Sequence, residues 1–551
     1  MTNPAGIVNV GLIGRIPESA VKATLSCARF GTPIAQSPVG SRVSEEFDYS
    51  GPFGLMQRNG VSLVRLALVR HGLLAMVGGI FLLWGCHPAS AQNLPPGPNS
   101  GINVGEGSER VAPTPQNTPA TTTQPVTSMT PGTGTDWTPT AFVNSRMPHW
   151  LRLNGELRSR FEAPTAYGFK PRDDDGYALT RAVLSLDASP TSWFRAFVQG
   201  RDAEALGANR QNITGSMKDA FDLEQAYIEL RSADHGWLSL QVGRQKMIYG
   251  DERLVGQSNW SNAGRSFDAL RLRLKSKAYG VRMDTFASTV VKNYPTALDR
   301  VLPGQNFYGE DVEFTKLVPK ATVGGFVYLK TLPSVIGVDK LAGNERLYTS
   351  GARAAGKFGG NFDYHGRYAF QSGRRADDPV HAWGAYGVLG YTIPRLRFQP
   401  RISIECAEAS GNKAIGDRVI GTFDQLYPTS HGRRGLTDSF AEANIKNFKP
   451  GFDFKPGKNM RVFLAVNQLW LASKYDGLYD SRTAALLVKV PAGGAPNSKV
   501  GTSIDLYGTY DINPKLALGA GLGRLYPGPF LKENTSGGSP TYPYLMLDYR
   551  F

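Results

Sequence analysis

The chain has few of the side chains that bind metals or form disulfides. Its 551 residues include only 3 cysteines and 7 histidines, and the histidines form no H-x-x-H pair. Only Cys406 follows the export signal described below, so neither an intramolecular disulfide nor a cysteine zinc site can form in the mature chain. We therefore expect no metal and no cofactor.

Long hydrophobic runs are scarce as well. The mean hydropathy of −0.26 is too low for a helical membrane protein. One apolar stretch, residues 72–86, follows three arginines and precedes small residues that end at Ala91, and it is too short to span a bilayer. It predicts a secretory signal peptide over residues 56–91, cleaved after its last residue. Since a signal peptide begins near the start of a chain, residues 1–55 are interpreted as a mis-called leader ahead of a start at Met56; an unusual extended leader is the alternative.

Positive charge exceeds negative charge. The whole chain has 61 basic and 46 acidic side chains, and removing residues 1–91 leaves 54 and 42, a net charge of +12. A basic balance favours an anionic partner such as nucleic acid, anionic lipid or an acidic substrate. Export argues against nucleic acid, because a protein outside the cytoplasm rarely meets it.

Residues 92–145 are dominated by proline, threonine, glycine, serine and asparagine. Such a segment cannot bury enough apolar surface to offset its chain entropy. We predict a disordered tether here, followed by a single β domain over residues 146–551.

In this β domain, apolar and charged side chains alternate with period two. Leu151, Leu153 and Leu157 share one phase, while Arg152 and Arg158 share the other. Soluble sandwiches and outer-membrane barrels both show such alternation. The signal peptide, the aromatic content of 11% and an alternating carboxyl-terminal segment that ends in phenylalanine favour the barrel. This ending resembles the signal that barrel-assembly machinery reads.

The size of the β domain sets the number of strands. At roughly 22 residues per strand with its connection, residues 150–551 supply about 18 antiparallel strands, with about 16 as the near alternative. We expect an all-β transmembrane barrel in the outer membrane, wide enough for an aqueous channel. Long connections are interpreted as extracellular loops or gating constrictions, and they lie at about 202–219, 292–310, 407–437 and 473–498.

The charged phase of the strands would line the barrel interior. Arginine suits repeated carboxylate recognition because its guanidinium stays charged and binds in a bidentate way. The predicted lumen set, from which substrate contacts are expected, is Arg152, Arg158, Arg160, Arg181, Arg271, Arg273, Arg282, Arg353, Arg367, Arg395, Arg397 and Arg401. Acids on the same phase would pair with part of this set and keep binding weak enough for release; they are Glu156, Asp187, Glu229, Asp284 and Glu405. For any one arginine, bracing of the wall is the alternative to substrate contact.

Several segments carry a family resemblance. They are Asp222–Leu230, Val242–Gly256, Trp260–Arg271, Gly421–His431 and Tyr526–Lys532. Together they resemble the bacterial alginate export family, over roughly residues 146–551. The resemblance implies an outer-membrane barrel whose electropositive lumen passes a polyuronate chain.

One of these segments contains an arginine that departs from the alternating pattern. Strict alternation from Leu240 and Val242 would direct Arg244 toward lipid, which is costly near the bilayer midplane. Either the strand ends at Gly243 or a bulge directs the side chain into the lumen. In the second case, Arg244 could join a buried network that holds the loop around Trp260. Such a network would either line the substrate path or serve folding alone. Its other members would be Asp251, Arg253, Asn262 and Arg265.

The preferred function is a channel for passive export of an anionic polysaccharide such as alginate, without covalent chemistry. Its partners would be the polysaccharide, outer-membrane lipid, barrel-assembly machinery and periplasmic export proteins. The alternatives are a substrate-specific porin for uptake of small carboxylates or phosphate, and a barrel-embedded enzyme acting on lipid or glycan. Against an enzyme, the sequence around Ser258 lacks the second glycine of a G-x-S-x-G elbow, and the acidic run at residues 173–175 is interpreted as a solvated turn.

Overall fold

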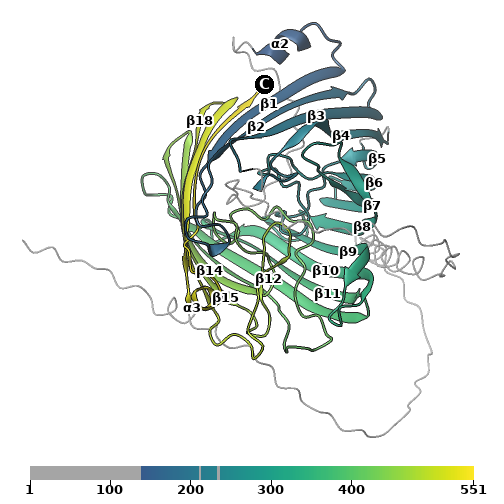
Figure 1. Ribbon diagram of the computed structural model, residues 1–551. Coiled ribbons are helices and arrows are strands. Elements are labelled where there is room, and N and C mark those ends of the chain that lie inside the picture. The colour runs from purple at the N-terminus through teal and green to yellow at the C-terminus, as the bar shows by residue number, and fades with distance from the viewer. Residues whose placement is uncertain (1–137, 210–211, 233–235) are drawn as a thin grey trace, which may run out of the picture. The chain divides into compact units, whose positions relative to one another are not determined.

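The architecture is a closed ring of antiparallel strands. A computed structural model describes residues 138–551 except 210–211 and 233–235 (Figure 1). The predicted leader, the signal peptide and most of the tether lie outside the described residues. The predicted all-β fold is confirmed.

Eighteen strands form the main sheet. Their bounds are β1 (Leu151–Glu162), β2 (Tyr177–Ala188), β3 (Phe194–Leu206), β4 (Asp219–Arg231), β5 (Leu238–Gln245), β6 (Phe267–Ser276), β7 (Val281–Lys292), β8 (Arg300–Phe314), β9 (Ala321–Ile336), β10 (Ala342–Phe358), β11 (Phe362–Arg375), β12 (Asp378–Thr392), β13 (Arg401–Ala409), β14 (Ile445–Gly457), β15 (Met460–Leu471), β18 (Lys499–Asn513), β19 (Leu516–Pro527) and β20 (Thr541–Arg550). A separate two-stranded sheet consists of β16 (Leu478–Tyr479) and β17 (Leu486–Val488).

The ring closes between its first and last strands. Each barrel strand pairs with the next one along the chain, β15 pairs with β18, and β20 returns to β1 with Leu157 opposite Tyr549. Closure leaves no exposed strand edge in the main sheet. The expected number of strands is confirmed, and the alternative of about 16 is wrong.

The two faces of the sheet have the predicted characters. Leu157 and Phe161 on β1 are 50% and 54% exposed, whereas Arg158 and Arg160 are 4% and 1% exposed. Because successive side chains of a strand point to opposite faces, the apolar residues lie outside the ring and the charged ones inside.

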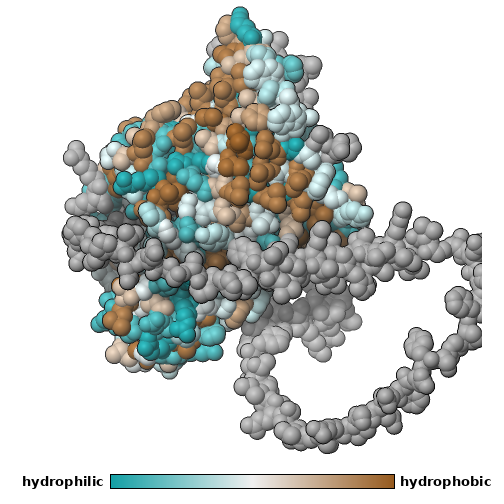
Figure 2. Space-filling view, turned by 90° about the vertical axis from the view of Figure 1, so that its right-hand side faces the viewer, coloured by the Kyte–Doolittle hydropathy of each residue, from teal (hydrophilic) through white to brown (hydrophobic). Residues whose placement is uncertain are grey.

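The outer face has an aromatic border at one end. Trp150, Trp193, Trp237 and Tyr279 are exposed beside the short turns of the barrel. Barrels that span membranes carry such girdles where the apolar surface meets water. On the side where β4–β9 lie, Figure 2 shows hydrophobic side chains gathered over the upper part of the described surface, with hydrophilic ones below.

The connections at the two ends of the barrel differ in length. Those at the end that holds the carboxyl terminus are short, such as residues 458–459 and 514–515. The other end carries the long loops over residues 246–266, 410–444 and 472–498. The connection predicted at 292–310 is shorter than expected, because β8 already begins at Arg300.

One predicted strand starts later than the alternation indicated. The pattern favoured a strand that includes Arg395 and Arg397, but β13 begins only at Arg401. Phe398 and Gln399 have φ angles of 71° and 43°, a left-handed conformation that interrupts an extended chain. Arg395 and Arg397 are therefore exposed in a turn, and the prediction that they face inward from a strand is wrong.

Within the described residues, helices are few and short. The last part of the predicted tether includes helix α2 (Pro139–Asn144), whose first turn is capped by the Thr138 hydroxyl, an acceptor from the Ala141 N–H at 3.1 Å. Short helices η3 (Tyr167–Phe169) and α3 (Pro529–Asn534) lie in loops. Over the described part of the chain, no helix has the length and apolar character needed to cross a bilayer.

Candidate functional site: the barrel lumen

Two long loops fold inward and join each other. The β5–β6 loop (residues 246–266) and the β13–β14 loop (residues 410–444) meet where Val255 and Tyr427 form a parallel bridge. The Gly256 N–H donates to the Tyr427 carbonyl at 2.9 Å, and the Tyr427 N–H donates to the Leu254 carbonyl at 2.9 Å. We call these two loops the lumen loop pair, and Figure 1 shows loop segments lying within the ring of strands.

Aromatic packing holds the lumen loop pair against the wall. Tyr249 stacks on Phe286 of β7 with ring centroids 5.6 Å apart, and Tyr427 contacts Phe307 of β8 edge-on at 5.0 Å. Tyr249, Phe286 and Phe307 are all buried, while Tyr427 is partly buried against them. Pairs of this geometry add about 0.5–1.5 kcal/mol beyond area burial, so this contact fixes the loops on the β7–β8 side.

Three predicted lumen arginines hold the opposite side of the β5–β6 loop. Arg158 donates to the carbonyls of Asn259 at 2.8 Å and Ser261 at 2.9 Å. Arg160 donates to the Trp260 carbonyl at 2.8 Å, and Arg181 donates to that of Asn259 at 3.1 Å. All three arginines face inward as predicted, but their donors are used to hold a backbone segment.

The predicted network around this loop is present in part. Arg253 pairs with Asp251 at 3.0 Å and with Glu405 of β13 at 2.8 Å. Burial disfavours the charged Asp251, but Arg433 and Arg253 outweigh it and hold the pKa of Asp251 well below its usual range. Arg433, which lies 3.7 Å from Asp251, comes from the other loop of the pair.

Two further members of that network also tie the loops in place. The Asn262 amide donates to the carbonyls of Thr180, Glu204 and Met217 at 2.9–3.1 Å. Arg265 donates to the Pro428 carbonyl at 2.8 Å and so links one lumen loop to the other.

Arg244 does not belong to this network. Strand β5 continues through Gln245 without a register shift, and Arg244 stays on the outer phase opposite Asp268. Its Nε donates to the Asp268 carboxylate at 2.8 Å. Both predicted explanations, a strand end at Gly243 and a bulge into the lumen, are wrong, because an acid on the same outer face supplies the partner.

The inner wall between β6 and β10 carries a ladder of ion pairs. Arg273 pairs with Asp284 at 2.6 Å, Arg353 with Asp311 at 2.6 Å, and Arg282 with Glu313 at 3.0 Å. Arg271 lies at the edge of this ladder, 4.0 Å from Asp284. All four arginines belong to the predicted lumen set and face inward.

Three further members of the predicted lumen set lie on other strands. Arg401 pairs with Asp363 at 2.6 Å and Asp453 at 2.9 Å, and Arg367 forms an ion pair with Glu442 of the β13–β14 loop. Arg152 is exposed near the start of β1.

Several charged residues of the lumen were not predicted from the sequence. Lys330 pairs with Asp424 at 2.5 Å, Lys449 with Glu405 at 3.2 Å, and Arg434 with Glu442 at 3.4 Å. Loop residues such as Asp424, Arg434 and Glu442 show no period-two signal. Only Lys330 and Lys449 lie on strands, where alternation with apolar neighbours could have indicated them.

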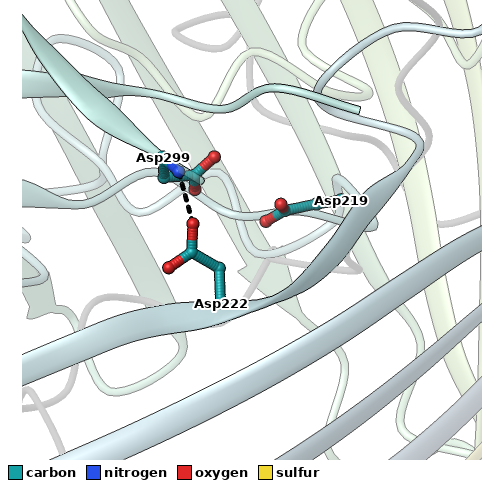
Figure 3. A group of neighbouring side chains, drawn as sticks. All are labelled: Asp219, Asp222 and Asp299. Atoms are coloured by element: carbon teal, nitrogen blue, oxygen red, sulfur yellow. Dashed lines mark hydrogen bonds between the residues drawn. The ribbon is translucent and has the colours of Figure 1, made fainter. Parts of the chain in front are cut away.

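A cluster of carboxylates lies where β4 begins and the β7–β8 loop ends. Asp219, Asp222 and Asp299 each offer an oxygen, and these oxygens lie within 4.8 Å of one another (Figure 3). Asp222 accepts a hydrogen bond from the Asp299 N–H, and Arg201 pairs with Asp219 and lies 3.4 Å from Asp299. Burial and the charge of Asp219 raise the pKa of Asp299 to about 7. Such an oxygen set suits a hard divalent cation. No local motif indicates it, because Asp299 lies 77 residues from Asp222 along the chain.

Comparison with known proteins agrees with this architecture. The chain is similar in structure to a BenF-like porin from Pseudomonas fluorescens Pf-5, with 10% identity, a TM-score of 0.50, and coverage of 73% of this chain and 98% of that one. It is also similar to OccAB2 of Acinetobacter baumannii, with 10% identity, a TM-score of 0.50, and coverage of 72% and 98%. At these identities the likeness shows the fold alone, a porin-like β-barrel. A comparison with curated proteins found no match.

The sequence itself gives the closer relationship. Residues 149–543 match the alginate export family, which covers nearly the whole barrel from just before β1 into β20. The predicted resemblance is thereby confirmed, and the chain belongs to the alginate export family.

Proposed function

We propose that this outer-membrane barrel exports an anionic polysaccharide such as alginate by passive passage along an arginine-lined lumen. The observation that carries the proposal is an excess of cations where the β13–β14 loop meets the wall. Five cations share three acids there: Arg253, Arg367, Arg433, Arg434 and Lys449 face Asp251, Glu405 and Glu442.

The electrostatics of this cluster favour an added anion. Burial, together with the nearby Arg253, outweighs the acid Glu442 and lowers the pKa of Arg434 to about 10. Uncompensated charge in a protein interior is costly unless a partner of opposite sign approaches. A carboxylate on a polymer would supply that partner, and a guanidinium can bind it with two parallel hydrogen bonds.

The ion-pair ladder on β6–β10 supports the same function from the adjoining part of the wall, where Arg353 lies opposite Arg367 in the register of β10 and β11. Arg271, Arg273, Arg282 and Arg353 face three acids, so this surface also has more cations than anions. Existing acid partners weaken each arginine's hold on a passing carboxylate. A polyanion could then exchange from one site to the next, since conduction needs binding that is weak enough for release.

The lumen loop pair would narrow this path. Its loops are held by hydrogen bonds and ring contacts, so passage of a polymer requires them to move or to leave a gap beside them. We propose that the loops restrict the channel to extended chains and that no covalent chemistry occurs.

Planar-bilayer recording of the purified barrel tests the proposal. We expect anion selectivity from reversal potentials, and block of the current by polyuronate at concentrations where monomeric uronate has no effect. The triple variant Arg271→Gln/Arg273→Gln/Arg353→Gln should lose most of both properties. A matched control removes three exposed turn cations instead, Arg395→Gln/Arg397→Gln/Lys458→Gln, and should leave them within about twofold.

Three outcomes would contradict the proposal. Cation selectivity would overturn the role of the lumen arginines. Equal block by monomeric uronate would favour a porin for small carboxylates, and turnover of a labelled lipid or glycan by the purified barrel would favour an enzyme.

A further inference from the structure

Two arginines face each other on the outer surface of the barrel. Arg346 of β10 lies directly opposite Arg374 of β11 in the strand register. Both are exposed, whereas Leu347 and Thr349, the inward neighbours on β10, are 2% and 0% exposed. The arginine pair therefore belongs to the outer phase of the sheet, at the end that carries the long loops.

Like charges directly opposite on neighbouring strands destabilise a sheet. No acidic side chain within the described residues forms an ion pair with either arginine, and the one hydrogen bond found runs from Arg374 to the Asp377 carbonyl at 3.3 Å. Arg244 shows the contrast, because it also lies on the outer phase near the long loops and has Asp268 opposite it at 2.8 Å. The fold thus pairs one outer arginine with an acid but leaves Arg346 and Arg374 side by side.

The position of Arg346 and Arg374 along the barrel axis indicates which layer of the membrane surrounds them. Tyr348, the next outward residue below Arg346, is 46% exposed, and Phe358 at the other end of β10 is 49% exposed. Ten residues at about 3.4 Å each, on a strand tilted by roughly 40°, separate these two aromatic side chains by about 26 Å along the barrel axis. This matches the apolar band of about 25 Å that outer-membrane barrels present to lipid. Arg346 and Arg374 therefore lie just above the band, at the level of lipid headgroups.

We propose that Arg346 and Arg374 together bind one phosphate of a phosphorylated glycolipid in the outer leaflet. Long loops of such barrels face the cell exterior, so the adjacent headgroups belong to that leaflet. A phosphate shared by two guanidinium groups accepts several charge-assisted hydrogen bonds and removes the repulsion between them. Exposed aromatic residues of β11, Tyr368 and Phe370, together with the partly exposed Trp383 of the neighbouring β12, supply the apolar surface below for the acyl chains.

Native mass spectrometry of the full barrel in detergent tests the site, with diphosphoryl lipid A as the probe. We expect the double variant Arg346→Gln/Arg374→Gln to bind this lipid about thirtyfold more weakly, from about 1 kcal/mol per cation near a charged surface. The conservative variant Arg346→Lys/Arg374→Lys should keep most of the binding. The matched control Lys455→Gln/Lys458→Gln, which removes two exposed cations at the opposite end, should bind like the parent. Retained heat-modifiable migration on gels would show that each variant is folded.

Two further binding measurements distinguish recognition of the lipid phosphate from other lipid contacts. Lipid A without phosphates should bind the parent and the double variant equally weakly, and inorganic phosphate in millimolar amounts should not displace the bound lipid. The proposal would be overturned if the double variant lost as much affinity for the dephosphorylated lipid as for diphosphoryl lipid A. So would unchanged binding of diphosphoryl lipid A, or full displacement by inorganic phosphate, which would mean a site for the free ion.

Discussion

Trp260 stacks on His431 with ring centroids 5.0 Å apart and ring planes inclined by 15°, although the two residues come from different loops. The Arg160 guanidinium lies 4.0 Å from the centre of the same indole, and Tyr544 of β20 contacts it edge-on at 5.2 Å. Trp260 therefore joins both lumen loops to the wall where the first and last strands meet. His431 in turn pairs with Asp438 of its own loop.

Replacing Trp260 should loosen the lumen loop pair. Trp260→Ala removes the ring that His431 and Arg160 share, and we expect a loss of about 3–5 kcal/mol in the stability of the loop arrangement. Single-channel conductance should rise and become noisier, because the loops sample positions farther from the wall. Trp237→Ala is the matched control, since that indole is 53% exposed at a short turn. Conductance that is the same in both variants would show that this contact does not restrict the channel.

The carboxylate cluster should make the β7–β8 loop sensitive to pH. In the folded protein the pKa of Asp299 is raised to about 7, above its ordinary value of 3.8, by burial and by Asp219. Because the pKa of Asp299 is higher in the folded protein, its protonation stabilises the folded β7–β8 loop. This stabilisation is complete below about pH 4 and is lost as the pH rises through 7. Amide hydrogen exchange over residues 293–299 should therefore be faster, after correction for intrinsic rates, at pH 8 than at pH 5.

A variant separates this titration from a general effect of pH. Asp299→Asn should make the corrected exchange rates of the β7–β8 loop nearly equal at the two pH values. Asp511→Asn, at an exposed site on the opposite end of the barrel, should leave the difference intact. If the loop of the parent protein exchanged faster at pH 5, the raised pKa of Asp299 would be refuted.

The outer pair of Arg244 and Asp268 should behave as a unit. Asp268→Leu leaves a lone cation near the edge of the apolar band and should lower the free energy of unfolding by about 1 kcal/mol. The double variant Arg244→Leu/Asp268→Leu should recover most of that loss, because both outward positions become apolar and no unpaired charge is left. Denaturant unfolding in lipid vesicles measures both, and additive losses in the double variant would rule out the coupling.

The sequence predicted most of the barrel because strand alternation is a local signal. Arg158, Arg271 and Arg353 alternate with lipid-facing residues within a few positions, so their inward direction could be predicted without knowing any partner. Arg395 and Arg397 also alternate with apolar residues, but positive φ angles at the end of that segment form a turn instead.

The lumen loops could not be predicted in the same way. Arg158 contacts Asn259 across 101 positions, and Arg253 contacts Glu405 across 152. Such contacts depend on how the closed ring places distant strands, and an irregular loop has no periodic pattern that records them. For Arg244 the alternation was correct, but its partner Asp268 could be identified only from the register of β5 and β6.

Removing one acid from the lumen should strengthen the interaction with anions while weakening the fold. Glu405 pairs with Arg253 at 2.8 Å and with Lys449 at 3.2 Å, and all three side chains are at most 10% exposed. In Glu405→Gln the two cations lose their shared acid, which should cost about 3–5 kcal/mol of stability. If the cations line the path of a polyanion, anion selectivity and block by polyuronate should both increase in bilayer recordings.

Glu408→Gln is the matched control, because Glu408 pairs with Lys446 at 3.0 Å on the outer phase of the same strands. A destabilised Glu405→Gln barrel with unchanged selectivity would mean that Arg253 and Lys449 only brace the wall, since charge that passing ions do not approach can alter stability without altering conduction.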